Sequence, residues 1–247
     1  MDNTYESEKL LGEYLLFHYG NPSQIMPWEF GPKNCFNFPI RTVTELLDLD
    51  SLEKRSNIKA LDVGCSVGGS TFELSKYCDE VSGVDLSKSF INAAKKISDG
   101  ESLQYKFLDE GDQFHSAKIK IDFDPKKKIS FEVADACSLP AELNNYPVVH
   151  AANLICRLPD PRLFINRLPD LVSPGGQLLL ATPFTWLNEF TPREKWLGSG
   201  DSEEKLKHLL ESHFDLEKRV DLPFIIREHK RKYQFSVSLG TRWRRKE

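Results

Sequence analysis

Hydrophobic positions along the chain follow two alternating periods. Short apolar runs bounded by Gly, Asp or polar turns, such as residues 58–64, predict strands, whereas amphipathic segments, such as residues 86–98, predict helices. Strands are predicted at residues 58–64, 80–85, 129–135, 146–155, 177–183, 216–223 and 232–243, and helices at residues 4–18, 40–55, 69–78, 86–98, 161–172 and 203–214. Strands that alternate with helices predict an α/β fold with a mostly parallel sheet covered on both faces.

Two segments depart from this alternation. Residues 20–39 combine four prolines with Trp28, Phe30, Phe36 and Phe38, which predicts a loop that packs on the molecule and covers a pocket. Residues 98–128 are polar and charged, and we interpret them as an insertion with its own helix or hairpin. We therefore expect a single domain over residues 1–247, with an N-terminal helical cover at residues 1–55 and a core at residues 56–247.

Composition narrows the class of protein. The chain has 247 residues, 40% of them hydrophobic, with 33 basic and 37 acidic residues, so its net charge of −4 excludes a global basic field for nucleic acid. No apolar run approaches the ~18 residues that a membrane span needs, and the polar start does not resemble a secretory signal. The five cysteines (35, 65, 78, 137 and 156) show no C-x-x-C spacing. We expect free thiols, no metal site and a cytoplasmic location.

The glycine-rich turn after the first core strand is the clearest chemical motif. The run Asp62-Val-Gly-Cys-Ser-Val-Gly68 follows a strand and opens a helix, which is the context of a nucleotide-binding loop. A dinucleotide loop needs a second glycine where Ser66 stands, whereas the acid-x-G-x-(G/S)-x-G pattern of S-adenosylmethionine-binding loops is complete. A carboxylate at Asp62 suits the cationic methionyl end of that cofactor and would repel a pyrophosphate. The motif therefore favours a methyltransferase over a dehydrogenase.

The next two core strands also end in acids. Asp85 lies 21 residues beyond Gly64, where a carboxylate can bind a ribose, and Asp135-Ala136 can bind an adenine edge. For each acid alone, a helix cap is the alternative interpretation. The full set of predicted cofactor-binding residues is Asp62, Gly64, Cys65, Ser66, Gly68, Asp85, Leu86, Asp135, Ala136 and Asn153.

The later elements resemble those of class I methyltransferases. The turn at residues 171–176 and the strand after it are similar to the entry into the fifth strand of that fold. The resemblance implies a Rossmann-like, seven-stranded, mostly parallel sheet that closes with a C-terminal antiparallel hairpin. It also implies that the methyl acceptor lies beside residues 152–158, after the fourth strand.

A narrower resemblance covers nearly the whole chain and is weakest near residues 98–128. The segments YESEKLLGEYLLFHYG (5–20), AANLICRLPDP (151–161), TPFTWLNEFTPREKWLGS (182–199) and PFIIREHKRKYQFSV (223–237) resemble the 4-mercaptohistidine N-methyltransferases of ovothiol biosynthesis. In that family the domain occurs alone or fused to a 5-histidylcysteine sulfoxide synthase, of which this sequence contains no part. The resemblance implies methyl transfer from S-adenosylmethionine to a ring nitrogen of 5-thiohistidine, with S-adenosylhomocysteine as the second product.

Candidate acceptor residues follow from position and chemistry. Asn153 and Arg157 stand after the fourth strand, and His18 on the N-terminal helix is a candidate proton acceptor; these three are the predicted catalytic residues. The predicted substrate-binding residues are Tyr14, Tyr19, Trp186, Glu189, Arg227 and His229, the last two placed in a late helix or loop. Purely structural roles remain open as alternatives, among them an Arg157–Asp160 ion pair and core packing of Trp186.

Two other functions compete with this interpretation. A methyltransferase for another small thiol or imidazole would carry the same cofactor loop, because acceptor loops diverge within one scaffold. A protein that binds the cofactor without catalysis would also keep the fold. In all three cases the expected partner is a small molecule, and neither nucleic acid nor a membrane is expected.

Overall fold

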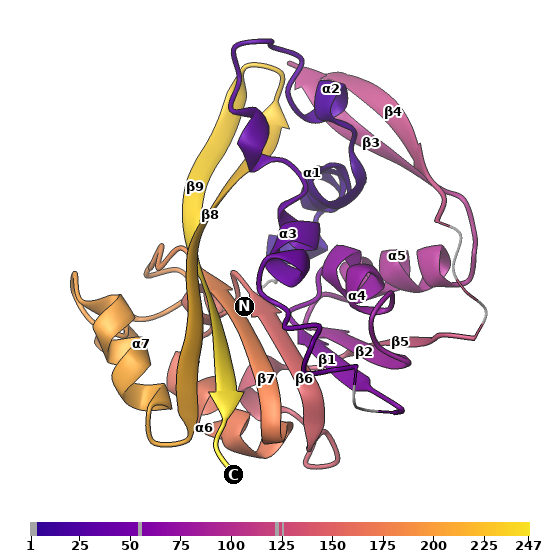
Figure 1. The fold of residues 1–247 in the computed structure, drawn as a ribbon. Helices are drawn as coiled ribbons and strands as arrows, with labels where there is room; N and C mark the ends of the chain where they lie inside the picture. The colour runs from indigo at the N-terminus through magenta and orange to yellow at the C-terminus, as the bar shows by residue number, and fades with distance from the viewer. Residues whose placement is uncertain (1–3, 54–55, 122–123, 125) are drawn as a thin grey trace.

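The computed structural model describes residues 4–53, 56–121, 124 and 126–247. Seven strands form one sheet in the order β5-β2-β1-β6-β7-β9-β8 (Figure 1). These strands are β1 (Lys59–Val63), β2 (Glu80–Asp85), β5 (Lys128–Val133), β6 (Tyr146–Ala152), β7 (Val172–Thr182), β8 (Phe214–His229) and β9 (Lys232–Arg245). The first five pair in parallel, and β9 runs antiparallel to both β7 and β8. The predicted fold class is confirmed.

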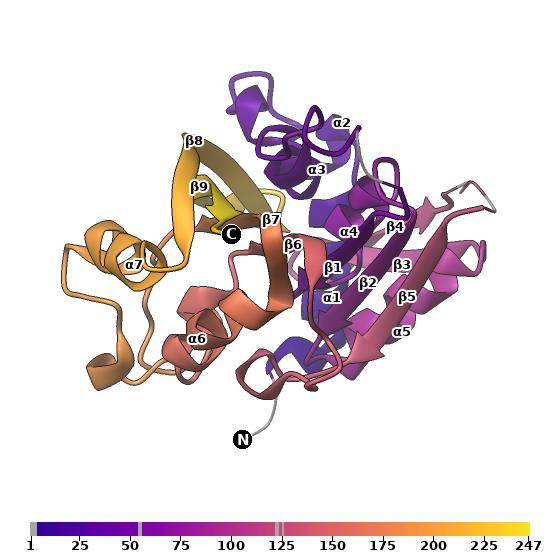
Figure 2. The same ribbon diagram turned by 60° about the horizontal axis from the view of Figure 1, so that its bottom comes forward.

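Helices cover both faces of this sheet because its strands are apolar on both sides (Figure 2). The helices of the core are α4 (Gly69–Leu74), α5 (Lys88–Ser98), α6 (Pro161–Leu171) and α7 (Ser202–Leu210). Leu61 of β1 packs in a cluster with Phe164 of α6, whereas its neighbour Ala60 packs in a cluster with Phe38 on the other face. Successive side chains of a strand point to opposite faces, so this alternation places the two layers.

The N-terminal segment folds more irregularly than its periodicity predicts. The helix expected at residues 4–18 is a 3₁₀ turn, η1 (Thr4–Glu6), followed by α1 (Glu8–Tyr19), which Ser7 caps by accepting a hydrogen bond from the Leu10 amide. The helix expected at residues 40–55 is the shorter α3 (Phe38–Thr44) and then turns, with residues 54–55 outside the described part. The aromatic loop contains the short helix α2 (Pro22–Ile25) and the turn η2 (Lys33–Cys35).

The segment expected as an insertion contains a hairpin. Strands β3 (Leu103–Glu110) and β4 (Gln113–Ile119) pair antiparallel in a sheet of their own, and residues 122–123 and 125 of the same segment lie outside the described part. Helix α1 lies directly on β3. A Cβ atom on Gly12 would meet the Lys106 carbonyl oxygen at 2.1 Å, so only glycine permits this approach.

The C-terminal hairpin is longer than its sequence pattern predicts, and this corrects the positions of two predicted site residues. Arg227 and His229, expected in a helix or loop, lie at the end of β8, where Arg227 pairs with Tyr233 of β9. The run Phe224–Ile226 is apolar and extended, and it continues the strand past the edge of the main sheet. The turn expected at residues 173–176 likewise belongs to β7.

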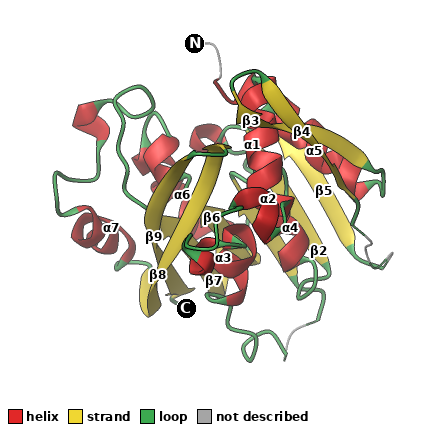
Figure 3. Ribbon diagram, turned by 90° about the horizontal axis from the view of Figure 1, so that it is seen from above, coloured by secondary structure: helices red, strands yellow, loops and turns green. Residues whose placement is uncertain are grey.

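The N-terminal elements, the β3–β4 hairpin and the far half of β8–β9 form a cover layer above the carboxyl ends of the parallel strands (Figures 1 and 3). Long-range contacts hold this layer together. The Trp28 indole N–H donates to the Lys230 carbonyl oxygen at 3.0 Å, and the buried Arg227 guanidinium donates to the Gln24 carbonyl oxygen at 2.6 Å and to Asp109 at 2.8 Å.

Adding a side chain at Gly12 tests the close approach of α1 to β3. We expect Gly12→Ala to lower the free energy of unfolding by about 1–3 kcal/mol, although alanine is the better helix former, because the methyl group displaces the β3 backbone. Urea denaturation measures the change. Glu8→Ala at the exposed start of the same helix is the control and should change stability by less than about 0.5 kcal/mol. An unchanged or raised stability of Gly12→Ala would contradict this packing.

Candidate functional site

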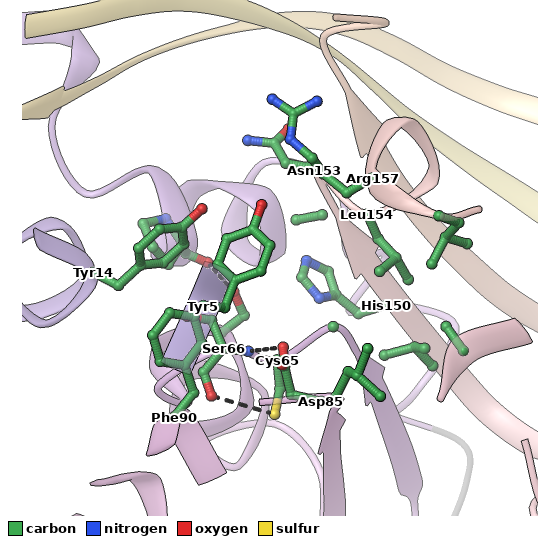
Figure 4. Close-up of a pocket in the computed structure, with 18 of the residues that line it drawn as sticks. Tyr5, Tyr14, Cys65, Ser66, Asp85, Phe90, His150, Asn153, Leu154 and Arg157 are labelled. Atoms are coloured by element: carbon green, nitrogen blue, oxygen red, sulfur yellow. Dashed lines mark hydrogen bonds between the residues drawn. The ribbon is translucent and has the colours of Figure 1, made fainter. Parts of the chain in front are cut away.

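A pocket opens where β1, β2, β5 and β6 end, beneath η1, α1 and α3 (Figure 4). Its described lining from the sheet side comprises Val63, Gly64, Cys65, Ser66, Ser70, Asp85, Leu86, Phe90, Ala134, Asp135, Ala136, His150, Ala152, Asn153, Leu154, Arg157, Leu158 and Pro159. Its lining from the cover layer comprises Tyr5, Tyr14, Phe17, His18, Phe38, Pro39 and Ile226. The site is therefore shared between the core sheet and segments remote from it in sequence.

The glycine-rich loop turns sharply at the pocket floor. The backbone φ angles of Gly64 and Ser66 are 73° and 52°, in the left-handed region. A Cβ atom on Gly64 would approach Leu154 to 2.9 Å, so glycine keeps room at this point of the floor. The Ser66 hydroxyl oxygen is buried and has no hydrogen-bond partner within the described part of the chain. A ligand that rests on the loop can satisfy it.

Asp85 presents a carboxylate at the end of β2. Its Oδ2 accepts a hydrogen bond from the Ser66 amide and its Oδ1 accepts one from the Ser87 amide, both at 2.9 Å. Burial raises the pKa of Asp85, and hydrogen bonds from the backbone of Ser87, Ser66 and Leu86 oppose that rise. Asp85 lines the pocket, and a carboxylate oxygen can accept more than one hydrogen bond, so this side chain can also accept from the hydroxyls of a ribose.

The end of β5 fits the other half of a nucleoside. Asp135 and Ala136 line the pocket, and Asp135 Oδ1 caps the turn η3 (Ala136–Ser138) by accepting from the Cys137 amide at 2.8 Å. Oδ2 of Asp135 is thus available to an adenine amino group. Leu86 also lines the pocket, and its exposed side chain can cover an adenine ring. Predicted cofactor residues from three strand ends are therefore brought together.

Asp62 and Gly68 lie behind the loop. Among the described residues Asp62 does not line the pocket, because its Oδ1 accepts from His150 Nδ1 at 2.7 Å and its Oδ2 from the Thr71 hydroxyl at 2.7 Å. Asp62 was expected to face a cationic ligand, but both oxygens serve the protein instead. Gly68 packs against the Phe131 ring, which a Cβ atom would meet at 2.9 Å.

His150 is a pocket residue that sequence analysis did not assign. Its side chain is 1% exposed, and its Nε2 lies 3.0 Å from the Thr42 hydroxyl of α3. The imidazole therefore links Asp62 of the core to the cover layer. The sequence did indicate a special role for His150, because it lies within the apolar strand β6. A polar side chain on a buried strand needs hydrogen-bond partners.

His18 caps the first helix of the core from above. Its Nδ1 accepts a hydrogen bond from the Gly69 amide at 3.1 Å, and burial lowers its pKa to about 3. The ring is therefore neutral with its proton on Nε2, which makes it a donor and argues against the predicted role of proton acceptor. The same contact occupies the Gly69 amide at the start of α4, so a pyrophosphate could not use it. Tyr19 donates its hydroxyl proton to the Val67 carbonyl at 2.5 Å, outside the pocket.

Asn153 and Arg157 define the polar end of the pocket. Asn153 has φ of 54°, and its Oδ1 accepts from the Ser238 hydroxyl at 2.6 Å, which leaves its amide N–H groups as donors. Arg157 donates to the Thr185 carbonyl at 2.8 Å and lies 5.0 Å from the Phe190 ring centroid. Within residues 4–53, 56–121, 124 and 126–247, no carboxylate forms an ion pair with Arg157. Asp160 pairs with Lys195 instead.

Two tyrosines face these donors in Figure 4. Tyr14 and Tyr5 stand with ring centroids 5.9 Å apart, and Tyr5 was not among the predicted site residues. Burial raises the pKa of both phenols, whereas the Arg157 side chain lowers that of Tyr5 by charge and hydrogen bonding. Both hydroxyls therefore stay protonated near neutral pH.

Besides Tyr19, four further predicted substrate residues do not line this pocket. Trp186 stacks on Trp196 and donates its indole N–H to Ser202, in agreement with the packing alternative, and Glu189 is exposed on the same loop. Arg227 and His229 lie at the tip of β8, in the contacts that hold the cover layer together. Their local sequence could not reveal this position, because it follows from the length of the hairpin.

The described part of the chain contains no group of three His, Cys, Asp or Glu side chains that could hold a metal ion. Where helices are described, none is long and apolar enough to cross a membrane.

The titration of His18 predicts a pH-dependent stability. The unfolded chain takes up a proton at His18 below about pH 6.5, whereas the folded protein does so only near pH 3. Stability from this residue is therefore complete above pH 6.5 and falls as the pH decreases. Between pH 7 and pH 5 we expect wild type to lose about 1–2 kcal/mol more than His18→Gln, which keeps an acceptor for Gly69. His208→Gln on the surface is the control, and parallel pH profiles of wild type and His18→Gln would refute the effect.

The Asp62–His150 pair predicts a non-additive mutant cycle. His150→Leu leaves a buried carboxylate without its main donor, so we expect a loss of about 3–5 kcal/mol in the free energy of unfolding. Asp62→Asn combined with His150→Leu should cost about 1–3 kcal/mol less than the sum of the single changes. Urea denaturation of all four proteins measures the coupling. His208→Leu should change little, and strict additivity of the pair would count against the buried interaction.

Comparisons with known proteins relate the chain to methyltransferases. Residues 61–180, from β1 to β7, match the family model described as a methyltransferase domain. The chain is 26% identical over 181 residues to tocopherol O-methyltransferase of Arabidopsis thaliana, covering 71% of this chain and 45% of that protein. It is also 26% identical over 137 residues to the ubiquinone biosynthesis O-methyltransferase of Coxiella burnetii, covering 54% of this chain and 48% of that protein. The matched regions span about half the length of these two relatives.

Solved structures show the same fold. The N-methyltransferase NodS of Bradyrhizobium japonicum, in complex with S-adenosylhomocysteine, superposes with a TM-score of 0.55 at 17% identity and covers 96% of this chain and 99% of that one. A SAM-dependent methyltransferase of Methanosarcina mazei gives 0.55 at 16% identity, covering 81% and 99%. Residues 61–180 therefore match a methyltransferase domain, and the chain has the Rossmann-like fold of these solved methyltransferases.

Proposed function

We propose that this protein transfers the methyl group of S-adenosylmethionine to an imidazole nitrogen of 5-thiohistidine. The observation that carries the proposal is the polar end of the pocket, where Asn153 and Arg157 offer N–H donors beside two tyrosine hydroxyls. A small acceptor with a carboxylate and a thiolate is the kind of molecule that such donors bind. The segments that resemble the 4-mercaptohistidine N-methyltransferases of ovothiol biosynthesis support the same acceptor.

The residues present fit the cofactor. Asp85 would accept the ribose hydroxyls, Asp135 and Ala136 would border the adenine, and the buried Ser66 hydroxyl would gain a partner. Bound S-adenosylmethionine supplies a sulfonium methyl that is already activated for displacement. The chain therefore needs no metal ion to activate the leaving group, and its task is to position the acceptor and exclude water.

Selectivity between sulfur and nitrogen is the main chemical demand of this reaction. A thiolate is the stronger nucleophile, so the site must hold the sulfur away from the methyl group. Arg157 is a fixed cation whose guanidinium can bind a thiolate or carboxylate, and Asn153 adds a second donor. The neutral His18 ring offers a third N–H donor from the cover layer. The aromatic cover of Tyr5, Tyr14 and Phe38 would limit the access of water.

The assay combines purified protein, S-adenosylmethionine and 5-thiohistidine, with histidine as the control acceptor. We expect S-adenosylhomocysteine to form only with the thiolated acceptor, and NMR of the product to place the methyl on a ring nitrogen. An S-methyl product, or turnover of a phenol in place of the thiohistidine, would overturn the proposed acceptor while leaving the cofactor assignment intact.

Two variants separate cofactor binding from acceptor binding. Asp85→Asn should weaken S-adenosylhomocysteine binding by about tenfold in calorimetry, because it removes a charged acceptor of ribose hydroxyls. Arg157→Gln should leave that affinity within about twofold and raise KM for the acceptor by about tenfold or more. Equal effects of both changes on cofactor affinity would argue against the proposed division of the pocket.

A further inference from the structure

The segment η1 is attached to the core by hydrogen bonds far apart in sequence. The Glu6 carboxylate accepts from the Lys88 amide at 2.7 Å and from the Ser89 amide at 3.2 Å, at the start of α5. The Tyr5 carbonyl oxygen accepts from the Ser87 and Ser89 hydroxyls, each at 3.1 Å. A carboxylate at a helix N-terminus satisfies free amides and interacts favourably with the helix dipole. Glu6 therefore acts as a cap for a helix that it does not belong to.

The helix that Glu6 caps is the one that follows the candidate ribose carboxylate. Asp85 Oδ1 accepts from the Ser87 amide at 2.9 Å, and the next two amides of the same turn donate to Glu6. The backbone turn at residues 87–89 therefore donates hydrogen bonds both to Asp85, the carboxylate that can bind the ribose, and to Glu6, which anchors η1. A ligand that orders this turn also orders the anchor of η1.

The anchored segment places the Tyr5 ring over the pocket. The centroid of the Tyr5 ring lies 5.9 Å from the ring centroid of Phe90 in α5 and 6.0 Å from that of Phe190. The Arg157 guanidinium in turn lies over the Phe190 ring. Figure 4 shows the Tyr5 and Tyr14 rings on one side of the pocket and Asn153 with Arg157 on the other. The Tyr5 hydroxyl also interacts with the Arg157 side chain, so the ring borders the polar end of the pocket and would contact an acceptor bound there.

We propose that Glu6 is a positioning residue that locks Tyr5 over the pocket by capping α5, so that the closed state of η1 depends on the turn that binds the cofactor. Tyr5 then contacts the acceptor. The part that concerns the acceptor rests on the proposed function, whereas the locking by Glu6 does not. Neither the capping by Glu6 nor the placement of Tyr5 follows from a local sequence pattern, because Glu6 and the α5 amides that it binds are more than eighty residues apart.

Hydrogen exchange and cofactor dissociation test the lock without an activity assay. In Glu6→Ala we expect faster amide exchange at Lys88 and Ser89, and a rate of S-adenosylhomocysteine dissociation raised about fivefold to tenfold, measured by surface plasmon resonance. Glu6→Gln keeps one acceptor oxygen and should restore part of both effects. Glu8→Ala removes an equal charge two residues away, and it should match wild type.

Steady-state kinetics with 5-thiohistidine tests the acceptor role. We expect Glu6→Ala and Tyr5→Phe to raise KM for the acceptor about fivefold to tenfold with kcat within about twofold. Unchanged exchange and dissociation in Glu6→Ala would overturn the lock, and an unchanged KM in Tyr5→Phe would overturn the contact. If wild type binds S-adenosylhomocysteine but does not turn over 5-thiohistidine, the proposed acceptor fails, and the exchange data still decide whether Glu6 locks η1.

Discussion

The Asp62 carboxylate is buried beneath the pocket floor, and much of the site depends on how its charge is satisfied. A buried ion without partners is costly, so the surrounding elements must supply donors at fixed distances. Thr71 of α4 and His150 of β6 do so, and His150 reaches onward to Thr42 of α3. One charge thereby fixes helix α4 after the glycine-rich loop, strand β6 and helix α3 of the cover relative to one another.

This arrangement explains why the pocket has two kinds of wall. The floor consists of strand ends, whose positions follow from the parallel pairing of β1, β2, β5 and β6. The roof consists of segments that reach the site only through long-range contacts, with α3 held by His150, α1 held by the His18–Gly69 bond and η1 held by Glu6. Helices α1 and α3 are also packed into the core through the buried side chains of Leu16 and Phe38, so among these roof segments η1 depends most on its hydrogen bonds.

Sequence patterns predicted the floor better than the roof. The positions of the parallel strands and the acids at the ends of β2 and β5 follow from local periodicity and from the rule that parallel strands end at one edge, whereas the C-terminal hairpin was expected from the resemblance to class I methyltransferases. Arg227 and Trp186 were misplaced because their partners, Asp109 and Trp196, are set by tertiary packing that no local pattern encodes. For the same reason Tyr5 was missed, since its position depends on the N-terminus of α5.

The charged and polar side chains around the pocket affect whether a neutral or an anionic acceptor binds better. Arg157 donates only to carbonyl, hydroxyl and thiol groups among the bonds described for it, and Asn153 turns its oxygen away toward Ser238. The polar end therefore has an excess of donors and a fixed positive charge. A neutral acceptor would leave this charge without a counter-ion after water is excluded, which is unfavourable, whereas an anionic acceptor would balance it. The electrostatics of the site thus favour an acceptor that carries a thiolate or carboxylate over an uncharged phenol.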